Sequence, residues 1–215
     1  MAIGLREAVG IANRVQRCDW TLMDRDTMSK NEKISGLAAP LNDARARGPV
    51  SAERWDPPYC GDIGLKICAD GTWVYRDSPI RREGLIKLFA SVLRKDADGR
   101  TYLVTPAEKF DVEVADAPFL VVEMEVHGKG SGQELIFRTN VNDIVRCGPQ
   151  HPLRFCIQRP SGGLKPYVRV RGRLDALVVR ALYYDLVALA VEEKRDGRSV
   201  LGLWSGGTFF TMQAA

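Results

Sequence analysis

Two segments of the chain resemble each other, and this internal repeat constrains the fold more than any other feature of the sequence. Residues 73–103 and 171–201, laid over each other without gaps, are identical at eight of 31 positions. Each copy has the pattern of a strand, a capped helix, an Asp-Gly-Arg turn and another strand. Because the order of elements repeats together with the residues, we predict an α+β fold with duplicated halves of strand hairpin, helix and strand. The identical positions are Asp77/Asp175, Arg82/Arg180, Leu88/Leu186, Ala90/Ala188, Asp98/Asp196, Gly99/Gly197, Arg100/Arg198 and Leu103/Leu201.

The first half carries clear turn and cap signals. Residues 63–68 and 72–76 flank an Ala-Asp-Gly turn, which predicts a hairpin. Ser78 and Pro79 have the residue types of a helix N-cap and of the first helical position. The apolar residues at 85–93 follow with the spacing of one helix face. The sequence therefore predicts a hairpin followed by a helix that begins near Pro79.

A second cap signal follows the Asp-Gly-Arg turn. Thr105-Pro-Ala-Glu108 fits a capping box, in which the threonine hydroxyl and the glutamate side chain satisfy backbone N–H groups at a helix start. We expect a strand at 101–104, a short helical turn, and a strand at 110–114.

The second half is rich in strands. Alternating apolar and polar residues predict strands at 119–126, 134–141 and 167–171, with shorter ones near 144 and 155. The run Gly-x-Gly-x-Gly at 128–132 is interpreted as a hairpin loop, because a dinucleotide fingerprint has to open a helix. Two further strands are expected around the glycines of WSGGTFF.

The second helix of the repeat, which Asp175 is expected to cap, is apolar around most of its circumference. A helix of this kind is usually buried on several sides. We therefore predict that it lies against the seam between the two halves. The residues concerned are Leu177, Val179, Leu182, Leu186, Leu189 and Val191.

The chain divides into three parts on these patterns. Residues 1–54 have little sustained periodicity and are expected to form a partly disordered N-terminal extension. Met28, which precedes the polar run SKNEKIS, is an alternative first residue. Residues 55–116 are predicted to form the N-terminal α+β half, and residues 117–215 the C-terminal half.

Composition narrows the class of protein. The chain is 45% hydrophobic and 27% charged, with a net charge of +4 that is spread evenly rather than gathered in a basic arm. The most apolar stretch, 174–191, is broken by charged residues and does not read as a membrane span. The first residues lack the basic-then-apolar order of a secretory signal. The five cysteines form no CxxC pair, which favours a reducing compartment. We expect a cytoplasmic protein with no membrane or nucleic-acid partner.

No catalytic or metal-binding set is recognisable. Cys60 and Cys68, like Cys147 and Cys156, are spaced more widely than typical zinc ligands, and buried thiols are the preferred interpretation. Ser205 lies in GLWSGG, which lacks the first glycine of a nucleophile elbow. We predict no catalytic residue, no metal and no cofactor.

Polar side chains on strand faces are better candidates for function. Period-two alternation places Tyr167, Arg169, Arg171 and Arg173 on one face, at spacings of roughly 7 Å. Guanidinium groups in series bind phosphates or carboxylates, although a solvated strand face is the alternative. Arg138 and Asn140 share a face in the same way, and Lys109 follows the capping box. Gly206 and Gly207 beside Trp204 form either an anion-binding nest with an aromatic wall or a plain turn.

From about Trp55 to Phe210 the chain resembles domain-of-unknown-function family 1285 of bacterial proteins. The segments that carry the resemblance are WDPPYCGDIGLKICADGTWVYRDSPI, LFASVLRKDADGRTYLVTPAEK, DAPFLVVEMEV, FRTNVNDIV, HPLRF, YVRVRGRLDAL and WSGGTFF. The resemblance implies a duplicated core whose C-terminal half is similar to a pleckstrin-homology-like β-roll with one helix. It also implies a cleft between the halves for a nucleotide-type ligand, and a role in signalling. It implies no enzymatic activity.

The resulting hypothesis is a non-catalytic protein of bacterial signalling that binds an anionic, nucleotide-type ligand between its halves. A protein–protein adaptor and an enzyme acting on a nucleotide are the alternatives. In the leading hypothesis Arg138 and Arg171 meet phosphate, Trp204 stacks on a base, and Asn140 and Thr105 hydrogen-bond to polar edges. The remaining candidate ligand contacts are Lys109, Arg169, Ser205, Gly206 and Gly207.

Overall fold

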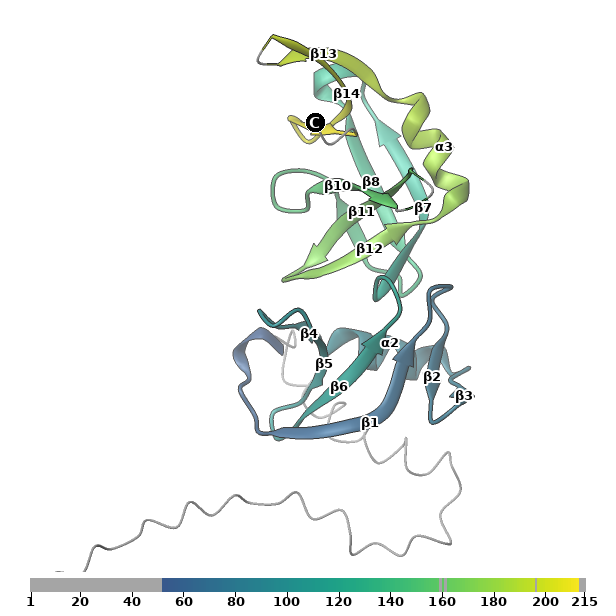
Figure 1. The fold of residues 1–215 in the computed structure, drawn as a ribbon, viewed down its shortest axis with the longest axis vertical. Helices are drawn as coiled ribbons and strands as arrows, with labels where there is room; N and C mark the ends of the chain where they lie inside the picture. The colour runs from purple at the N-terminus through teal and green to yellow at the C-terminus, as the bar shows by residue number, and fades with distance from the viewer. Residues whose placement is uncertain (1–51, 159, 161, 196, 213–215) are drawn as a thin grey trace, which may run out of the picture.

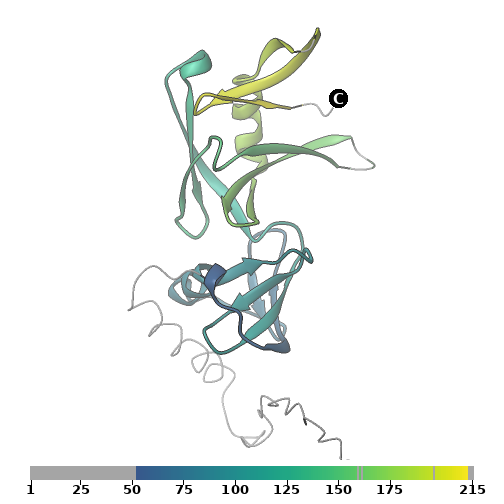
Figure 2. The same cartoon turned by 90° about the vertical axis from the view of Figure 1, so that its left-hand side faces the viewer.

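The computed structural model describes residues 52–158, 160, 162–195 and 197–212. Two halves, each with a six-stranded sheet of its own, are stacked along the long axis of the molecule (Figures 1 and 2). The predictions for residues 1–51 lie outside the described residues. The described chain begins with a short 3-10 helix, η2 (Ala52–Arg54).

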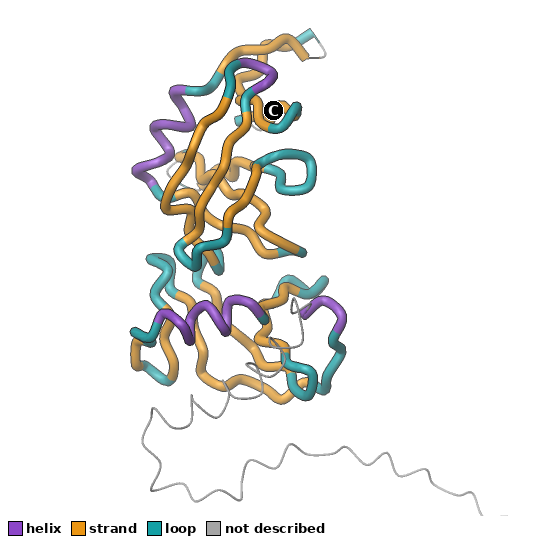
Figure 3. The backbone as a smooth tube through the Cα atoms, turned by 180° about the vertical axis from the view of Figure 1, so that it is seen from behind, coloured by secondary structure: helices purple, strands orange, loops and turns teal. Residues whose placement is uncertain are grey.

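The N-terminal half combines one sheet with one helix. In its sheet the strands run in the order β3-β2-β1-β6-β5-β4, and β1 and β6 pair in parallel at the centre. Helix α2 lies across one face of this sheet (Figure 3). The elements after η2 are β1 (Tyr59–Ile67), β2 (Trp73–Tyr75), β3 (Ser78–Pro79), α2 (Glu83–Ser91), β4 (Leu93–Lys95), β5 (Thr101–Val104) and β6 (Lys109–Val114).

The core of this half forms where the apolar face of α2 meets the sheet. Leu88 and Phe89 of the helix are buried, as the periodicity predicts. They belong to one cluster with Leu65, Ile67 and Trp73 of the first hairpin. The same cluster of buried apolar side chains continues into the C-terminal half, so the two halves share a continuous core.

The C-terminal half contains two sheets and one helix. The larger sheet has the order β10-β11-β12-β7-β8-β9, with β12 and β7 parallel at its centre, and the smaller has the order β13-β14-β15. The elements are β7 (Phe119–His127), η3 (Gly130–Gly132), β8 (Glu134–Thr139), β9 (Ile144–Arg146), β10 (Leu153–Gln158), β11 (Gly163–Arg171), β12 (Leu174–Val178), α3 (Arg180–Ala188), β13 (Val191–Arg195), β14 (Arg198–Ser205) and β15 (Thr208–Thr211).

The strands expected from alternation are present. In β8, for example, Leu135, Phe137 and Thr139 are buried, whereas the residues between them are half-buried. The glycine-rich run 128–132 joins the antiparallel strands β7 and β8, which confirms the hairpin loop. The last two strands, β14 and β15, surround the glycines of WSGGTFF.

The predicted duplication is confirmed in the order of the elements. Each half has a nine-residue helix followed by an antiparallel meander of three strands, β4-β5-β6 in one half and β13-β14-β15 in the other. The halves differ in where the meander goes. In the N-terminal half β6 joins the sheet through its parallel pairing with β1, whereas β13-β14-β15 form a separate sheet.

Both predicted helix caps at the repeat are wrong. Ser78 and Pro79 form β3, because the N–H of Ile80 bonds to the carbonyl of Trp73 at 2.7 Å and draws this segment into the sheet. Helix α2 therefore begins only at Glu83. Asp175 lies within β12, where Arg154 and Arg169 form ion pairs with its carboxylate. The N-cap residue of α3 is Val179 instead. The turn at 105–108 is also not helical.

The prediction that the second helix lies at the seam is wrong as well. Helix α3 lies at the outer edge of the C-terminal half, and Leu186 is its one fully buried side chain. The helix that meets the other half is α2, whose Ala90 carbonyl accepts a hydrogen bond from Arg171. Within the described residues, no helix is long and apolar enough to cross a membrane.

Candidate ligand-binding site

A cavity of about 490 Å³ lies where the first sheet meets the connection between the halves. This volume is within the range of about 300–1,000 Å³ that is usual for small-molecule sites. Strands β1, β4, β5 and β6 form most of the wall, and the connection closes it. The lining residues are Asp62, Lys95, Gly99, Arg100, Thr101, Asp111, Val112, Glu113, Val114, Asp116 and Pro118.

A bulged stretch of β1 supplies Asp62 to this wall. The pairing of β1 with β6 is irregular on both sides of this residue. Gly61 and Gly64 have φ values of +89° and +76°, which residues with a Cβ rarely adopt. The carboxylate of Asp62 accepts the N–H of Gly64 at 2.7 Å, so the bulge fixes the direction of this side chain.

The Asp-Gly-Arg turn between β4 and β5 supplies Gly99 and Arg100. The carboxylate of Asp98 accepts the N–H of Arg100 at 2.9 Å, and the N–H of Gly99 bonds to the carbonyl of Asp96 at 3.2 Å. Gly99 has a φ of +83° and meets nothing within 4 Å where a Cβ would stand. This open position in the turn leaves the backbone accessible from the cavity.

Most of the charges in the cavity wall are paired. Three of the four carboxylates bind a cation in the pairs Asp111–Arg100 at 2.5 Å, Glu113–Lys66 at 2.7 Å and Asp116–Lys165 at 2.6 Å. Lys95 is different, because its side chain is half-buried and no residue of the described chain pairs with its ammonium group. A half-buried cation without a carboxylate partner favours an anionic ligand group.

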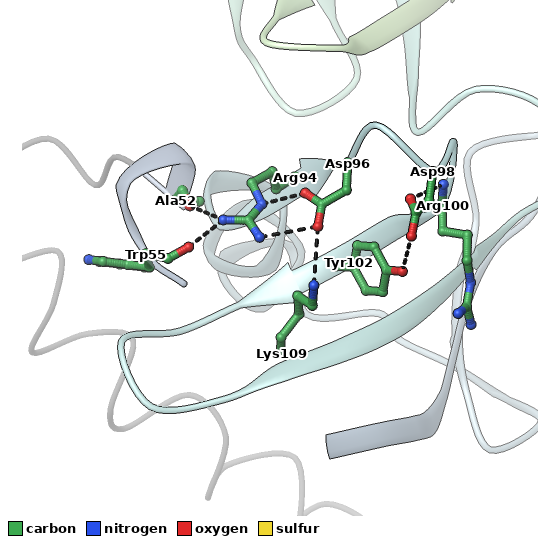
Figure 4. Close-up of polar contacts among 8 residues, drawn as sticks. All are labelled: Ala52, Trp55, Arg94, Asp96, Asp98, Arg100, Tyr102 and Lys109. Atoms are coloured by element: carbon green, nitrogen blue, oxygen red, sulfur yellow. Dashed lines mark hydrogen bonds and ion pairs between the residues drawn. The ribbon is translucent and has the colours of Figure 1, made fainter. Parts of the chain in front are cut away.

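A network of ion pairs and hydrogen bonds supports the turn (Figure 4). Arg94 is buried, and its guanidinium group bonds to both carboxylate oxygens of Asp96, at 2.6 and 3.2 Å. It also donates to the carbonyls of Ala52 and Trp55. Burial alone would raise the pKa of Asp96, but the hydrogen bonds from Arg94 and Lys109 outweigh it and hold the pKa below its usual range. Asp96 therefore stays ionised and anchors the start of the turn.

Tyr102 anchors the other end of the turn. Its hydroxyl donates to Asp98 at 2.6 Å, and this hydrogen bond, together with burial, raises the pKa of Tyr102 to about 12. The guanidinium group of Arg100 lies over the Tyr102 ring, 5.6 Å from its centroid. The two residues that the turn gives to the cavity, Gly99 and Arg100, are thus held in place by the contacts of Asp98, Tyr102 and Asp111.

Asp116 connects the cavity with the C-terminal half. Its carboxylate accepts bonds from Lys165 at 2.6 Å and from the hydroxyl of Tyr167 at 2.7 Å, both on β11. Burial would raise the pKa of Asp116, but these bonds outweigh it and lower the pKa. The pKa of Tyr167 is raised, first by burial and then by its bond to Asp116.

Of the residues predicted from the sequence, Lys109 begins β6 and Thr105 follows β5, two strands of the cavity wall. Lys109 pairs with Asp96 at 3.2 Å and lies over the Tyr102 ring, 4.5 Å from its centroid. The hydroxyl of Thr105 accepts the N–H groups of Ala107 and Glu108, which closes the turn between β5 and β6. Lys109 thus belongs to the supporting network, and Thr105 to a turn; neither lines the cavity.

Arg171 and Asn140 lie at the contact between the halves. Arg171 binds Asp143 at 2.9 Å and donates to the Ala90 carbonyl of α2. Asn140 accepts the N–H of Leu120 at 3.0 Å, and its amide packs against Gly71 in the turn between β1 and β2. Both side chains therefore have structural partners that join or border the two halves.

Arg138 and Arg169 are also paired, and they lie apart from each other. Arg138 forms an ion pair with Glu123 on the outer face of β7 and β8. Arg169 binds Asp175 at 2.5 Å and the carbonyl of Gly172 at 2.8 Å. The expected arginine series on β11 is interrupted by an irregularity in its pairing with β12 between Arg169 and Arg171.

The segment from Trp204 to Gly207 fastens the small sheet to the large one. Ser205 is fully buried, and its hydroxyl accepts the N–H of Leu135 at 2.9 Å and donates to the carbonyl of Cys147 at 2.8 Å. The N–H of Gly206 bonds to the carbonyl of Gln133 at 3.0 Å. This amide is therefore occupied by the protein itself.

Trp204 has aromatic and acidic neighbours rather than open surroundings. Its ring N–H donates to Glu193 at 2.6 Å, and the ring meets Phe209 edge to face with centroids 5.5 Å apart. Gly207 adopts a φ of +72° in the turn to β15. The predicted site residues thus fall into separate groups, and ligand contact by any of them stays a prediction.

The cavity residues were missed at the sequence level although one signal pointed to them. The Asp-Gly-Arg turn occurs in both copies of the repeat, and Arg100 is one of the identical positions. Lys95 has no local signal, because its lack of a partner depends on residues distant in sequence.

The described residues offer binding groups rather than an evident nucleophile. The lining consists of carboxylates, two cations, a threonine and small or apolar residues. The Cys147 thiol lies in the core, and burial raises its pKa to about 12. In the parts of the chain that the structure covers, histidine, cysteine and carboxylate side chains form no group of three suited to a metal ion.

Known proteins resemble this chain over most of its length. One family model, described as the N-terminal domain of the domain of unknown function DUF1285, matches residues 48–117. A second, described as the C-terminal domain of the protein of unknown function DUF1285, matches residues 118–212. The border between them falls one residue from the border between halves that the sequence predicts.

Two crystal structures are similar as well. A DUF1285 family protein from Silicibacter pomeroyi DSS-3 is 43% identical, with a TM-score of 0.70 over 80% of this chain and 93% of that one. A DUF1285 family protein from Shewanella baltica OS155 is 27% identical, with a TM-score of 0.46 over 59% of this chain and 91% of that one. No curated protein matches the chain. Both domain models and the 43% identical structure agree, and the chain belongs to the DUF1285 family.

Proposed function

We propose that this protein binds a nucleotide-type anionic ligand, without transforming it, in the cavity beside the connection between its halves. The observation that carries the proposal is Lys95, a half-buried residue that lines the cavity and whose ammonium group no described residue pairs. A phosphate group would supply the missing counter-charge and several hydrogen-bond acceptors.

The other lining groups fit the remainder of such a ligand. Arg100 and the backbone at Gly99 lie in the same wall as Lys95 and add donors for phosphate oxygens. Asp62 and Asp111 present carboxylate oxygens, which are suited to sugar hydroxyl groups and to amino groups of a base. A purely anionic ligand such as a bare phosphate chain is less well matched, because these carboxylates would repel it.

A signalling role is part of this proposal. Asp116 lines the cavity and also holds Lys165 and Tyr167 of the C-terminal half. Ligand binding beside Asp116 would change the contacts between the halves, which is how a non-catalytic protein transmits occupancy to a partner.

A thermal-shift screen of the purified full chain tests the proposal, with nucleoside monophosphates, cyclic dinucleotides and dinucleotide cofactors as probes. At 100 times its dissociation constant a ligand adds roughly 2.7 kcal/mol to the free energy of unfolding. Lys95→Gln should abolish the shift. Lys194→Gln, which makes the same charge change on exposed β13, should keep it. A panel without any shift, or shifts that Lys95→Gln leaves intact, would argue against the site.

A protein–protein adaptor is the second candidate, and one observation favours it. Strand β10 is an edge of the larger C-terminal sheet, and its Ile157 is 52% exposed. Edge strands of pleckstrin-homology-like modules add a strand from a partner, and a pleckstrin-homology-like C-terminal half is part of this candidate. The adaptor would be favoured if no nucleotide shifted the melting temperature and if Ile157→Lys no longer captured a protein partner that the wild type binds. Turnover of any nucleotide in the panel would instead favour an enzyme.

A further inference from the structure

Helix α3 has two apolar faces, and the described residues cover only one of them. The inner face packs on the protein through Leu186, which is fully buried, and through the half-buried Leu182 and Leu189. The outer face is formed by Ala181, Tyr184, Val187 and Ala188, all exposed, and Val191 continues it just beyond the helix end. We call these five residues the outer stripe.

The exposure of the outer stripe is large for apolar side chains. Tyr184 is 61% exposed, Val187 39% and Val191 43%. At 100° per residue Tyr184, Val187 and the two alanines fall within one third of the helix circumference. Helix α3 lies at the outer edge of the C-terminal half in Figures 1 and 3. A contiguous apolar stripe in this position indicates a protein contact.

The charged residues at the two ends of the outer stripe favour a second copy of this chain as its partner. Arg180 stands at the N-terminal end of the stripe, and Glu192 stands just past its C-terminal end. Between them the stripe carries no charge. If two copies of α3 pack antiparallel, the Arg180 of each copy lies near the Glu192 of the other, and each large Tyr184 lies opposite a small Ala188.

The position of Arg180 on the helix dipole also favours a second copy of this chain as the partner. Arg180 is in the first turn of α3, where a cation is unfavourably placed against the partial positive charge of the helix N-terminus. No described residue of the same chain pairs with its guanidinium group. A carboxylate from a second copy would offset this repulsion, and two-fold symmetry would supply it twice.

We propose that the protein forms a two-fold symmetric dimer in which the outer stripes of two copies pack antiparallel. Helix α3 has nine residues and is about 13 Å long, so the contact belongs to the smaller class of interfaces, below about 1,200 Å². The dimer is therefore weak and its population depends on concentration. The proposal is independent of the ligand cavity, whose lining includes no residue of α3.

Sedimentation equilibrium of the full chain, whose monomer mass is 23.9 kDa, tests this proposal. The average mass should rise toward twice that value as the concentration approaches ~100 µM. This concentration is well above the micromolar dissociation constants at the weak end of standard-size interfaces. Tyr184→Arg should raise the dimer dissociation constant by roughly 30-fold or more, as expected for a central interface residue. Ile144→Arg, at a position on β9 that is also 61% exposed, should leave it unchanged.

Charge reversal separates the two-fold arrangement from other contacts, and it does not require Tyr184→Arg to fold. Arg180→Glu should weaken the dimer, and the double variant Arg180→Glu/Glu192→Arg should restore it. A wild-type protein that stays monomeric up to ~100 µM would overturn the proposal. So would a dimer that Tyr184→Arg or Arg180→Glu leaves intact, or one that Ile144→Arg also breaks.

Discussion

Arg94→Met is expected to destabilise the protein strongly, because it removes the cation at the centre of the network in Figure 4. Methionine keeps the apolar stem but loses all hydrogen bonds of the guanidinium group. The loss leaves the carbonyls of Ala52 and Trp55 without this donor, and it leaves the carboxylate of Asp96 with Lys109 as its remaining cation. The residue is only 8% exposed, so water replaces these bonds poorly.

The expected magnitude follows from the type of contact that is broken. Removing one partner of a buried, hydrogen-bonded ion pair costs about 3–5 kcal/mol, and the retained bond from Lys109 to Asp96 places the estimate in the lower part of that range. Arg146→Met is the matched control. Arg146 pairs with Glu134 at 3.1 Å, but its side chain is 66% exposed, so a loss of less than about 1 kcal/mol is expected.

Urea unfolding of both variants, followed by circular dichroism, measures the difference. The pKa of Asp96 is lowered in the folded protein, so its contribution is present above the unfolded pKa and is lost as pH falls through the folded one. The gap between wild type and Arg94→Met should therefore shrink as the pH falls below about 4. Equal losses for the Arg94 and Arg146 variants, or a gap that persists at low pH, would refute this account of the network.

Three further predictions concern other parts of the fold. Gly206→Ala should destabilise the protein by more than about 2 kcal/mol, because its Cβ would stand 2.9 Å from the Cys147 carbonyl oxygen at a φ of +54°. Gly207→Ala meets nothing within 4 Å and should cost about 1 kcal/mol; chemical denaturation compares the two variants, and equal costs would contradict the packing argument. In the wild type the folded state holds the Tyr102 hydroxyl protonated, so part of the free energy of unfolding is lost between pH 10 and about 12. Tyr102→Phe should lack this pH-dependent part. Unfolding curves at pH 9 and 12 check this, and identical pH dependence of both proteins would speak against it. Arg171→Ala should cost about 2 kcal/mol and increase amide exchange at the end of α2, since its bond to that helix is lost; unchanged exchange there would show that Arg171 does not join the halves.

Much of the secondary structure could be predicted because it depends on local patterns. The alternation in β8 and the apolar face of α2 are each readable from a short segment. The repeat revealed the order of elements in both halves. The caps at Ser78 and Asp175 failed for one reason: sheet hydrogen bonds and ion pairs with distant residues outweighed a local preference worth about 1 kcal/mol.

The candidate site was harder to predict because it depends on partners rather than on residue types. Spacing along the strands predicted arginines as ligand contacts, but Arg138, Arg169 and Arg171 each pair with a carboxylate from elsewhere in the chain. Lys95 lacks such a partner among the described residues, and no short pattern marks that difference. The apolar circumference of α3 was recognised, but which face stays uncovered depends on where β7 and the rest of the half lie.

A calorimetric titration of the wild-type protein, Lys95→Gln and Lys194→Gln, with the nucleotide that gives the largest thermal shift, tests whether Lys95 binds the phosphate of a ligand. Saturable binding is expected for the wild type and for Lys194→Gln. Lys95→Gln, which loses a charged hydrogen bond to phosphate, should bind at least about tenfold more weakly. Equal affinity in all three proteins, or no binding to any of them, would contradict the assignment of a nucleotide-type ligand to this cavity.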